Sequence, residues 1–239
     1  MIGLGTLMNT AAIAAAGIAG HRFGRIFDGE KQRSLNRVCG VCVLFIGVAG
    51  AMEGMLALSS GSLSSGRSMF VVLSLALGTV AGELLRIEDG FERFGEWLKR
   101  KTGNAGDARF VDAFVTASLT VSIGAMAIVG SLEDGIRGDY STLAVKAVLD
   151  FLIIAVMSSS MGKGAAFSAV PVFLFEGLMT LLARLIAPAM TDAALTNISL
   201  IGSILVFCVG VNLVWGKLLR VANMLPAILF AVLAAFLPL

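Results

Sequence analysis

The sequence predicts an all-α, polytopic membrane protein with about eight transmembrane helices and no separate water-soluble domain. Apolar residues make up 57% of the 239 residues, charged residues only 14%, and the mean hydropathy is +0.92. An average soluble domain has about 25% charged residues, so a soluble chain of this length could not bury so much apolar surface. Stretches without Asp, Glu, Lys or Arg also recur along the chain, and the longest cover 1–20, 113–132, 193–216 and 221–239.

A spanning helix needs roughly 20 mainly apolar residues. Shorter charge-free stretches also qualify where a flanking charge can reach the headgroups. Strands of a transmembrane barrel would alternate polar and apolar residues, which 193–216 does not do. We therefore expect residues 1–239 to form a single helical transmembrane domain. The expected spans are 2–22, 37–57, 69–87, 110–131, 141–160, 164–188, 195–215 and 217–237.

The basic residues predict the orientation of these spans. Alternate connections hold 14 of the 18 Lys and Arg residues, and the other side holds Arg67, Arg137, Lys146 and Arg184. The positive-inside rule places the side with 14 charges in the cytoplasm. Both the N-terminus and the C-terminus are then expected outside.

The longest basic connection predicts an additional helix. Residues 86–102 carry apolar side chains near helical period among charges, which is typical of an amphipathic helix in the cytoplasmic membrane interface. An ordinary solvated connector helix fits the same pattern. Residues 1–57 and 69–131 also resemble two copies of one helix–connector–helix unit. Small residues at four-residue spacing, such as Gly50/Gly54 and Gly78/Gly82, predict close helix packing within the monomer or in an oligomer.

Two expected spans carry acidic residues near the middle of the membrane. Asp150 lies nine residues into the span 141–160, so it is about 13 Å deep. Lys146 precedes it by one helical turn and can form an i, i+4 ion pair with it. Glu176 is similarly deep in the next span, where Pro171 is expected to bend the helix. Charged groups in a membrane interior are costly and usually functional, although a purely structural Lys146–Asp150 pair remains an alternative.

Further polar residues complete the candidate pathway. Asn9 lies in the outer half of the first expected span, and Asn212 and Asn223 lie toward the inner ends of the last two; all three could instead be hydrogen-bonding glue between helices. Glu133 and Asp134 are expected near the outer interface. If Gly124 and Gly130 interrupt the span 110–131, this acidic pair could instead fold inward as a cation site.

Several functional classes have no support in the sequence. There is no metalloprotease, nucleophile-elbow, P-loop or dinucleotide-binding motif, and His21 is the only histidine, so we expect neither an enzyme nor a metal or other cofactor. The cysteines Cys39, Cys42 and Cys208 are expected to be packing residues. The net charge of +2 argues against a nucleic-acid partner.

Four segments carry a family resemblance. The start MIGLGTLMNTAAI, the central VSIGAMAIVGSLEDGIRGDYS, the segment FSAVPVFLFEG and the end KLLRVANMLPAI resemble the YqgA/YdfK-type family of bacterial inner-membrane proteins. This resemblance implies a multi-pass protein of the bacterial cytoplasmic membrane, without known enzymatic activity and loosely described as a transport protein. It also implies Gln at the position of Glu176, which shifts the preferred pathway residues toward Asn9, Glu133, Asp134 and Asp150.

The leading hypothesis is therefore a small transporter or permease that moves a small solute or ion past these buried polar groups. A channel-like homo-oligomeric pore is the first alternative. A non-transporting membrane scaffold or sensor that binds a partner through 86–102 is the second. The lipid bilayer is the one partner that the composition itself requires.

Overall fold

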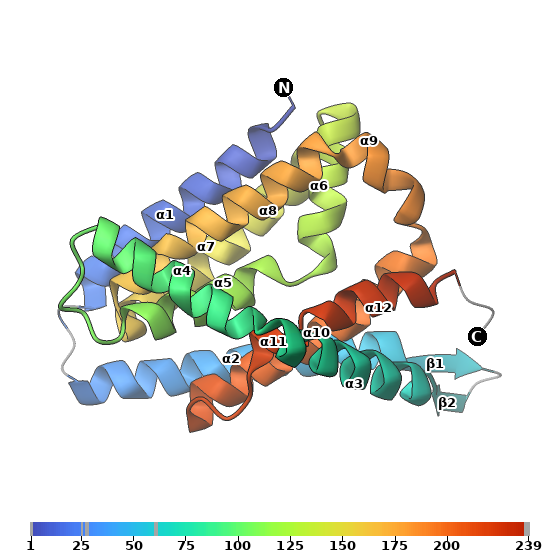
Figure 1. Cartoon of the computed structure of the whole chain (residues 1–239), viewed down its shortest axis with the longest axis horizontal. Coiled ribbons are helices and arrows are strands. Elements are labelled where there is room, and N and C mark those ends of the chain that lie inside the picture. The colour runs from blue at the N-terminus through green and yellow to red at the C-terminus, as the bar shows by residue number, and fades with distance from the viewer. Residues whose placement is uncertain (1, 25, 27–28, 60–61, 237–239) are drawn as a thin grey trace.

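A computed structural model describes residues 2–24, 26, 29–59 and 62–236, and it is helical apart from one short hairpin (Figure 1). The hairpin replaces the loop expected between the second and third spans and pairs β1 with β2 in antiparallel fashion. The elements are α1 (Leu4–Gly24), α2 (Gly29–Met55), β1 (Leu56–Ser59), β2 (Ser62–Ser65), α3 (Ser68–Leu85), α4 (Ile87–Lys101), α5 (Phe110–Ser122), α6 (Ala125–Arg137), α7 (Ser141–Met161), η1 (Lys163–Ser168), α8 (Ala169–Leu181), α9 (Ala183–Ile186), η2 (Ala187–Ala189), α10 (Asp192–Trp215), α11 (Val221–Met224) and α12 (Pro226–Ala234).

Within the described residues, five helical segments are long and apolar enough to cross a membrane, and the bent pair α5–α6 would make six. The five are α2, α3, α7, α10 and the combined segment Lys163–Leu181. The expected number of eight is therefore not confirmed. Two expected spans are not among these six. One is α1, whose last turn carries His21 and Arg22, and the other is the shorter apolar segment Val221–Ala234.

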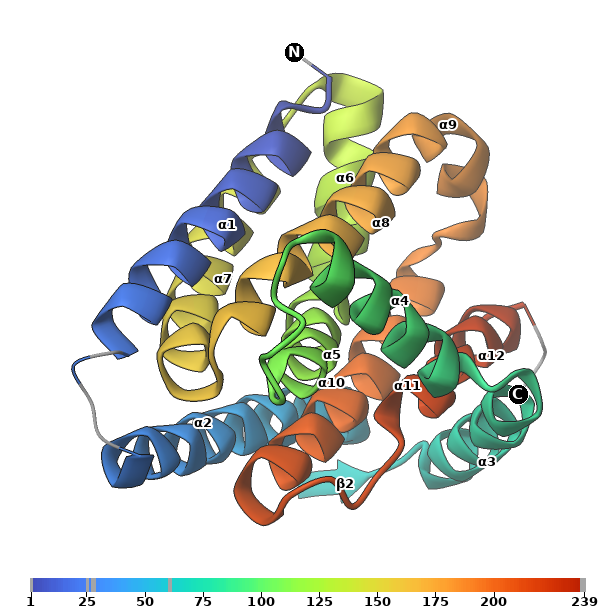
Figure 2. The ribbon, with the colours of Figure 1, turned by 60° about the vertical axis from the view of Figure 1, so that its left-hand side comes forward.

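The helices form two groups (Figures 1 and 2). In the first group α1 packs along α7 and also contacts α8, and α6 packs on α8. In the second group α2 packs along α10, and α3 packs on α11 and α12. Helix α5 lies between the groups, and α2 of the second group also packs directly against α7 of the first. The amphipathic α4 packs against α5 and against α11 of the second group. The expected repeat units 1–57 and 69–131 remain a prediction.

Glycines allow the paired helices to approach backbone to backbone. A Cβ at Gly20 of α1 would collide with the carbonyl of Ala155 in α7, and a Cβ at Gly82 of α3 would collide with the carbonyl of Asn223. Gly54 of α2 similarly faces Leu200 of α10. The small residues at four-residue spacing therefore serve packing within the monomer, as van der Waals contact is a main source of helix association in lipid.

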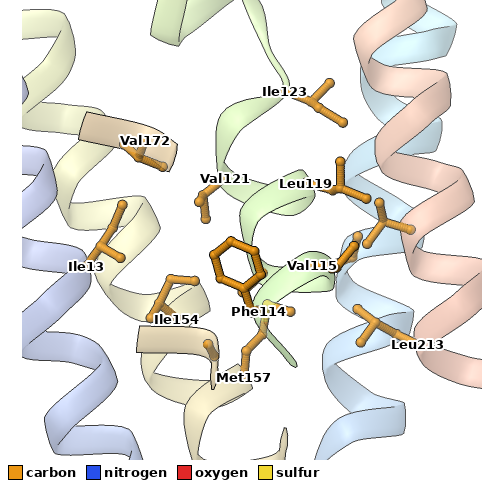
Figure 3. Packing of buried hydrophobic residues seen from close by; sticks show 14 of the residues in the cluster. Ile13, Phe114, Val115, Leu119, Val121, Ile123, Ile154, Met157, Val172 and Leu213 are labelled. Carbon is orange, nitrogen blue, oxygen red and sulfur yellow. The ribbon is translucent and has the colours of Figure 1, made fainter. Parts of the chain in front are cut away.

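Buried side chains of α5 join the two groups (Figure 3). Phe114 is fully buried and points toward Ile13 of α1 and Met157 of α7, whereas Val115 and Leu119 point toward Leu213 of α10. Because α5 contributes to both sides of the core, a movement of one group against the other would have to rearrange this helix.

The span expected at 110–131 is not one continuous helix. Helix α5 ends at Ser122, Ile123 is extended, and α6 continues at an angle of 64°. Gly124 has φ 151° and ψ 152°, a conformation that side-chain-bearing residues rarely adopt. Two other expected spans are also divided: 164–188 into η1, α8 and α9, and 217–237 into a non-helical start, α11 and α12.

The close approach of α1 to α7 predicts that Gly20→Ala is destabilising. The added methyl group has no space beside Ala155, and overpacking of this kind costs about 1–3 kcal/mol. Thermal unfolding of the detergent-purified variant should therefore show a lower melting temperature. Gly90→Ala in α4 is the matched control, because its Cβ meets no atom within 4 Å, and it should not lower the melting temperature. Equal melting temperatures for both variants would contradict this packing.

Candidate functional site

Four polar side chains from three helices meet inside the first helix group. Asn9 of α1 donates hydrogen bonds from Nδ2 to Asp150 Oδ2 of α7 at 3.0 Å and to Glu176 Oε1 of α8 at 2.8 Å. Lys146 Nζ pairs closely with Asp150 Oδ2 and lies 3.9 Å from Glu176 Oε1. All four residues are buried, with exposed fractions of 0% for Asn9, 6% for Lys146, 4% for Asp150 and 1% for Glu176. We call these four residues the charged cluster.

Local structure accounts for each position in the cluster. Lys146 and Asp150 are one turn apart on α7, as their spacing predicts, and the i, i+4 pair is present. The bend expected at Pro171 remains a prediction. Pro171 lies in the first turn of α8, where its missing N–H leaves no hydrogen bond unmade.

The break between α5 and α6 supplies a further ligand to the cluster. Lys146 Nζ donates a 2.7 Å hydrogen bond to the backbone carbonyl of Val121. In a continuous helix this carbonyl would accept from the N–H four residues later, but the turn at Gly124 leaves it free. The cluster is thus attached to the element that lies between the two helix groups.

The charged cluster has more negative than positive groups. One ammonium faces two carboxylates, and Glu176 Oε2 and Asn9 Oδ1 are buried without a hydrogen-bond partner. An unpaired charge is costly in a medium without water, so the second carboxylate requires a proton or a bound cation. Glu176 Oε2 can accept a proton, and both oxygen atoms can coordinate a cation. All four side chains are buried in this conformation, at 6% exposure or less.

A line of polar side chains leads from the cluster toward the expected outer face. One turn from Asn9 and Glu176, the hydroxyls of Thr6 and Thr180 lie 3.3 Å apart. Sequence reasoning did not identify Thr180, because a lone threonine in an apolar helix is an ordinary residue. Only its placement opposite Thr6 distinguishes it.

The acidic pair in α6 does not join the charged cluster. Asp134 is fully buried and accepts hydrogen bonds from the backbone N–H groups of Gly3 at 3.1 Å and Gly5 at 3.0 Å. It therefore satisfies the unpaired donors at the start of α1 and complements that helix dipole. Glu133 accepts from the hydroxyl of Thr142 at 2.6 Å. Gly124 interrupts the helix, as the inward-folding alternative required. The interruption does not bring Glu133 and Asp134 to the cluster; it brings the Val121 carbonyl to Lys146.

The two asparagines near the expected cytoplasmic end also lie outside the cluster. Asn223 Oδ1 accepts from the backbone N–H of Glu88 at 2.7 Å and so holds the first turn of α4. Asn212 Oδ1 accepts from the N–H groups of Leu218 and Leu219, both at 2.9 Å, and fixes the connection after α10. Both residues hold backbone in place, although Asn212 also lines a cavity.

A second buried carboxylate occurs in α4. Glu88 is 2% exposed, and its Oε1 pairs with Lys217 Nζ at 2.8 Å; Lys217 also pairs with Glu92. Burial opposes the charged form of Lys217, but the hydrogen bonds to these carboxylates outweigh that effect and raise its pKa. No sequence pattern indicated this contact, because the partners are more than a hundred residues apart and each belongs to a charged connection.

Comparison with known proteins identifies the family. A family described as "Protein of unknown function (DUF554)" matches residues 4–236, and the chain belongs to it. The chain is 25% identical to "Uncharacterized membrane protein YdfK" of Bacillus subtilis (strain 168), over 97% of this chain and 95% of the relative. It is 23% identical to "Uncharacterized protein YqgA" of Escherichia coli (strain K12), over 95% and 94%. No solved structure matches. The expected resemblance is thus confirmed, and the chain is a helical membrane protein.

The charge balance of the cluster predicts the effect of removing its ammonium. Lys146→Met leaves two buried carboxylates without a cation, and breaking a buried ion pair in this way costs about 3–5 kcal/mol. Thermal unfolding should therefore show strong destabilisation. The double variant Lys146→Met/Asp150→Leu removes both charges of the pair and should recover most of the loss. If the double variant were no more stable than the single one, packing rather than charge would explain the effect.

Proposed function

We propose that this protein is a small transporter or permease, and that its charged cluster binds a proton or a monovalent cation during transport. The observation that supports this proposal is the charge balance: one ammonium faces two carboxylates, and two oxygen atoms lack partners. A purely structural ion pair would need only Lys146 and Asp150. Glu176 and the unpartnered Oδ1 of Asn9 are in excess of that requirement.

The surrounding helices are suited to a transport cycle. Discontinuous helices near the middle of a membrane commonly form ion and substrate sites in transporters, because their free backbone groups serve as ligands. Here the break in α5–α6 supplies the Val121 carbonyl to Lys146. Neutralising a carboxylate would weaken its hold on the ammonium, and the ammonium in turn holds the break. Binding of a proton or cation to the cluster would thereby affect the position of α5, the helix between the two groups.

The polar line through Thr6 and Thr180 supports access from the outer side. The four residues of the cluster are buried in this conformation, which suits an occluded state of a transporter better than an open pore. We place the protein in the bacterial cytoplasmic membrane with its basic connections inside, following the positive-inside rule. No enzymatic step is proposed.

Transport can be measured on protein reconstituted in liposomes and adsorbed to a solid-supported membrane. We expect transient currents when the wild-type protein meets a pulse of its solute, from a panel of protons, Na⁺, K⁺, amino acids, organic acids and sugars. Asp150→Asn and Glu176→Gln should each reduce the current at least about tenfold, because each removes a charge-assisted contact worth roughly 1.5–3 kcal/mol. Both variants should remain folded.

Two exposed carboxylates provide matched controls. Asp192→Asn and Glu53→Gln make the same chemical changes outside the cluster and should leave the current unchanged. An unaltered current in Asp150→Asn would remove the cluster from the mechanism. Unitary steps in single-channel recordings would instead favour a pore, and the absence of a current with every solute would favour a non-transporting scaffold.

A further inference from the structure

Two cavities are lined in part by α5 and contain none of the four residues of the charged cluster. The first has a volume of about 190 Å³ and lies between α4, α5, α10 and the connection 216–220, at the expected cytoplasmic end. The second has a volume of about 450 Å³ and lies between the α5–α6 break, α8, α10 and α12. Leu119 lines both cavities. We call them the acidic cavity and the apolar cavity.

We propose that the two cavities together bind an amphipathic organic cation, with its cationic head in the acidic cavity and its apolar part beyond Leu119. In this conformation the ammonium of Lys217 occupies the position of the head. The inference deepens the proposed transport function by naming the substrate class. It rests on that function only for the claim that the ligand is moved across the membrane.

The acidic cavity has the charge required for a cationic head. Glu88, Glu92 and Asp112 line it, and Lys217 is the only cationic residue that does. Glu88 is almost fully buried, and its Oε2 has no hydrogen-bond partner. Asn36, Thr116 and Asn212 add neutral polar groups to the lining. Three carboxylates around one ammonium leave a negative potential in a confined space, which attracts a second cation.

The surrounding basic residues do not cancel this charge. Arg33, Arg37 and Arg109 line an adjoining cavity, which shares several lining residues with the acidic cavity: Asn36, Asp112, Met161, Asn212, Leu213 and Gly216. None of these three guanidinium groups lines the acidic cavity. The acidic cavity itself is therefore lined by more carboxylates than cationic groups.

The apolar cavity excludes a simple hydrated ion. Ser118 and Ser122 carry the polar side chains of its lining, and the other lining residues are apolar or glycine. Ser118 already donates to the carbonyl of Phe114, whereas the Ser122 hydroxyl is buried without a partner. An inorganic ion would lose its hydration here without replacement, whereas a hydrocarbon or aromatic group would gain contacts. The ligand must therefore combine a cation with an apolar group.

Lys217 acts as a tethered substitute for the cationic head. Its Nζ lies between Glu88 and Glu92, and its side chain is 50% exposed. The same connection is anchored separately by Arg220, which pairs with Glu83 and Asp89. Loss of the Lys217 side chain would therefore leave the connection in place and free two carboxylates for another cation.

The test measures binding of benzyltrimethylammonium to the full-length protein in nanodiscs by isothermal titration calorimetry. Tetramethylammonium supplies the head alone, and benzylsulfonate supplies the ring with the opposite charge. We expect benzyltrimethylammonium to bind more tightly than either control. Glu92→Gln should weaken binding about tenfold through loss of one charged contact, and Lys217→Met should strengthen it by a similar factor through loss of the internal competitor.

Leu119→Trp tests the connection between the cavities, since its larger side chain should reduce the affinity for benzyltrimethylammonium to that for tetramethylammonium. Asp150→Asn should bind benzyltrimethylammonium normally but not transport it, so the site and the transport mechanism can fail separately. Equal binding of benzylsulfonate would show an apolar site filled by lipid chains and overturn the proposal. Absence of benzyltrimethylammonium binding to Lys217→Met would also overturn it.

Discussion

Lys146 is the charge on which the first helix group depends. Its ammonium contacts carboxylates from α7 and α8 and the free carbonyl at the end of α5, and Asn9 of α1 bonds to the same two carboxylates. Without water, a buried charge has only such partners. Separating α1, α5, α7 and α8 would therefore leave buried charges unpaired, unless another cation or a proton took the place of the ammonium. The proton or cation binding that we propose would act on the helix group through this constraint.

The two helix groups are held together by different means. Within each group, glycines bring backbones into contact, so the groups are rigid units with little freedom to repack. Between them, α2 packs directly against α7, α10 contacts α6, and α5 contacts both groups. These contacts are less extensive than those of the helix pairs α1–α7 and α2–α10 within the groups. Relative movement of intact groups is consequently the change that this architecture favours.

The residues show where sequence reasoning succeeded and where it stopped. Lys146 and Asp150 share one helix, so their spacing sufficed to predict the pair. Glu176 and Asn9 were recognised as costly, but nothing in the sequence placed them beside Asp150. Asp134 is equally costly, yet it caps α1 rather than joining the cluster. The free-energy cost of burying a polar side chain in the membrane shows that the residue needs a partner, but it does not show which residue the partner is.

The sequence by itself determined the solvent and the helical class, because these follow from hydropathy, and it predicted the depth of the buried charges from a fixed rise per residue. Small-residue spacing also indicated close packing. The tertiary structure decided the rest: that α1 lies against α7, that the helix expected at 110–131 breaks at Gly124, and that Glu88 meets Lys217. These features depend on contacts between distant segments, and local pattern carries no information about which helices become neighbours.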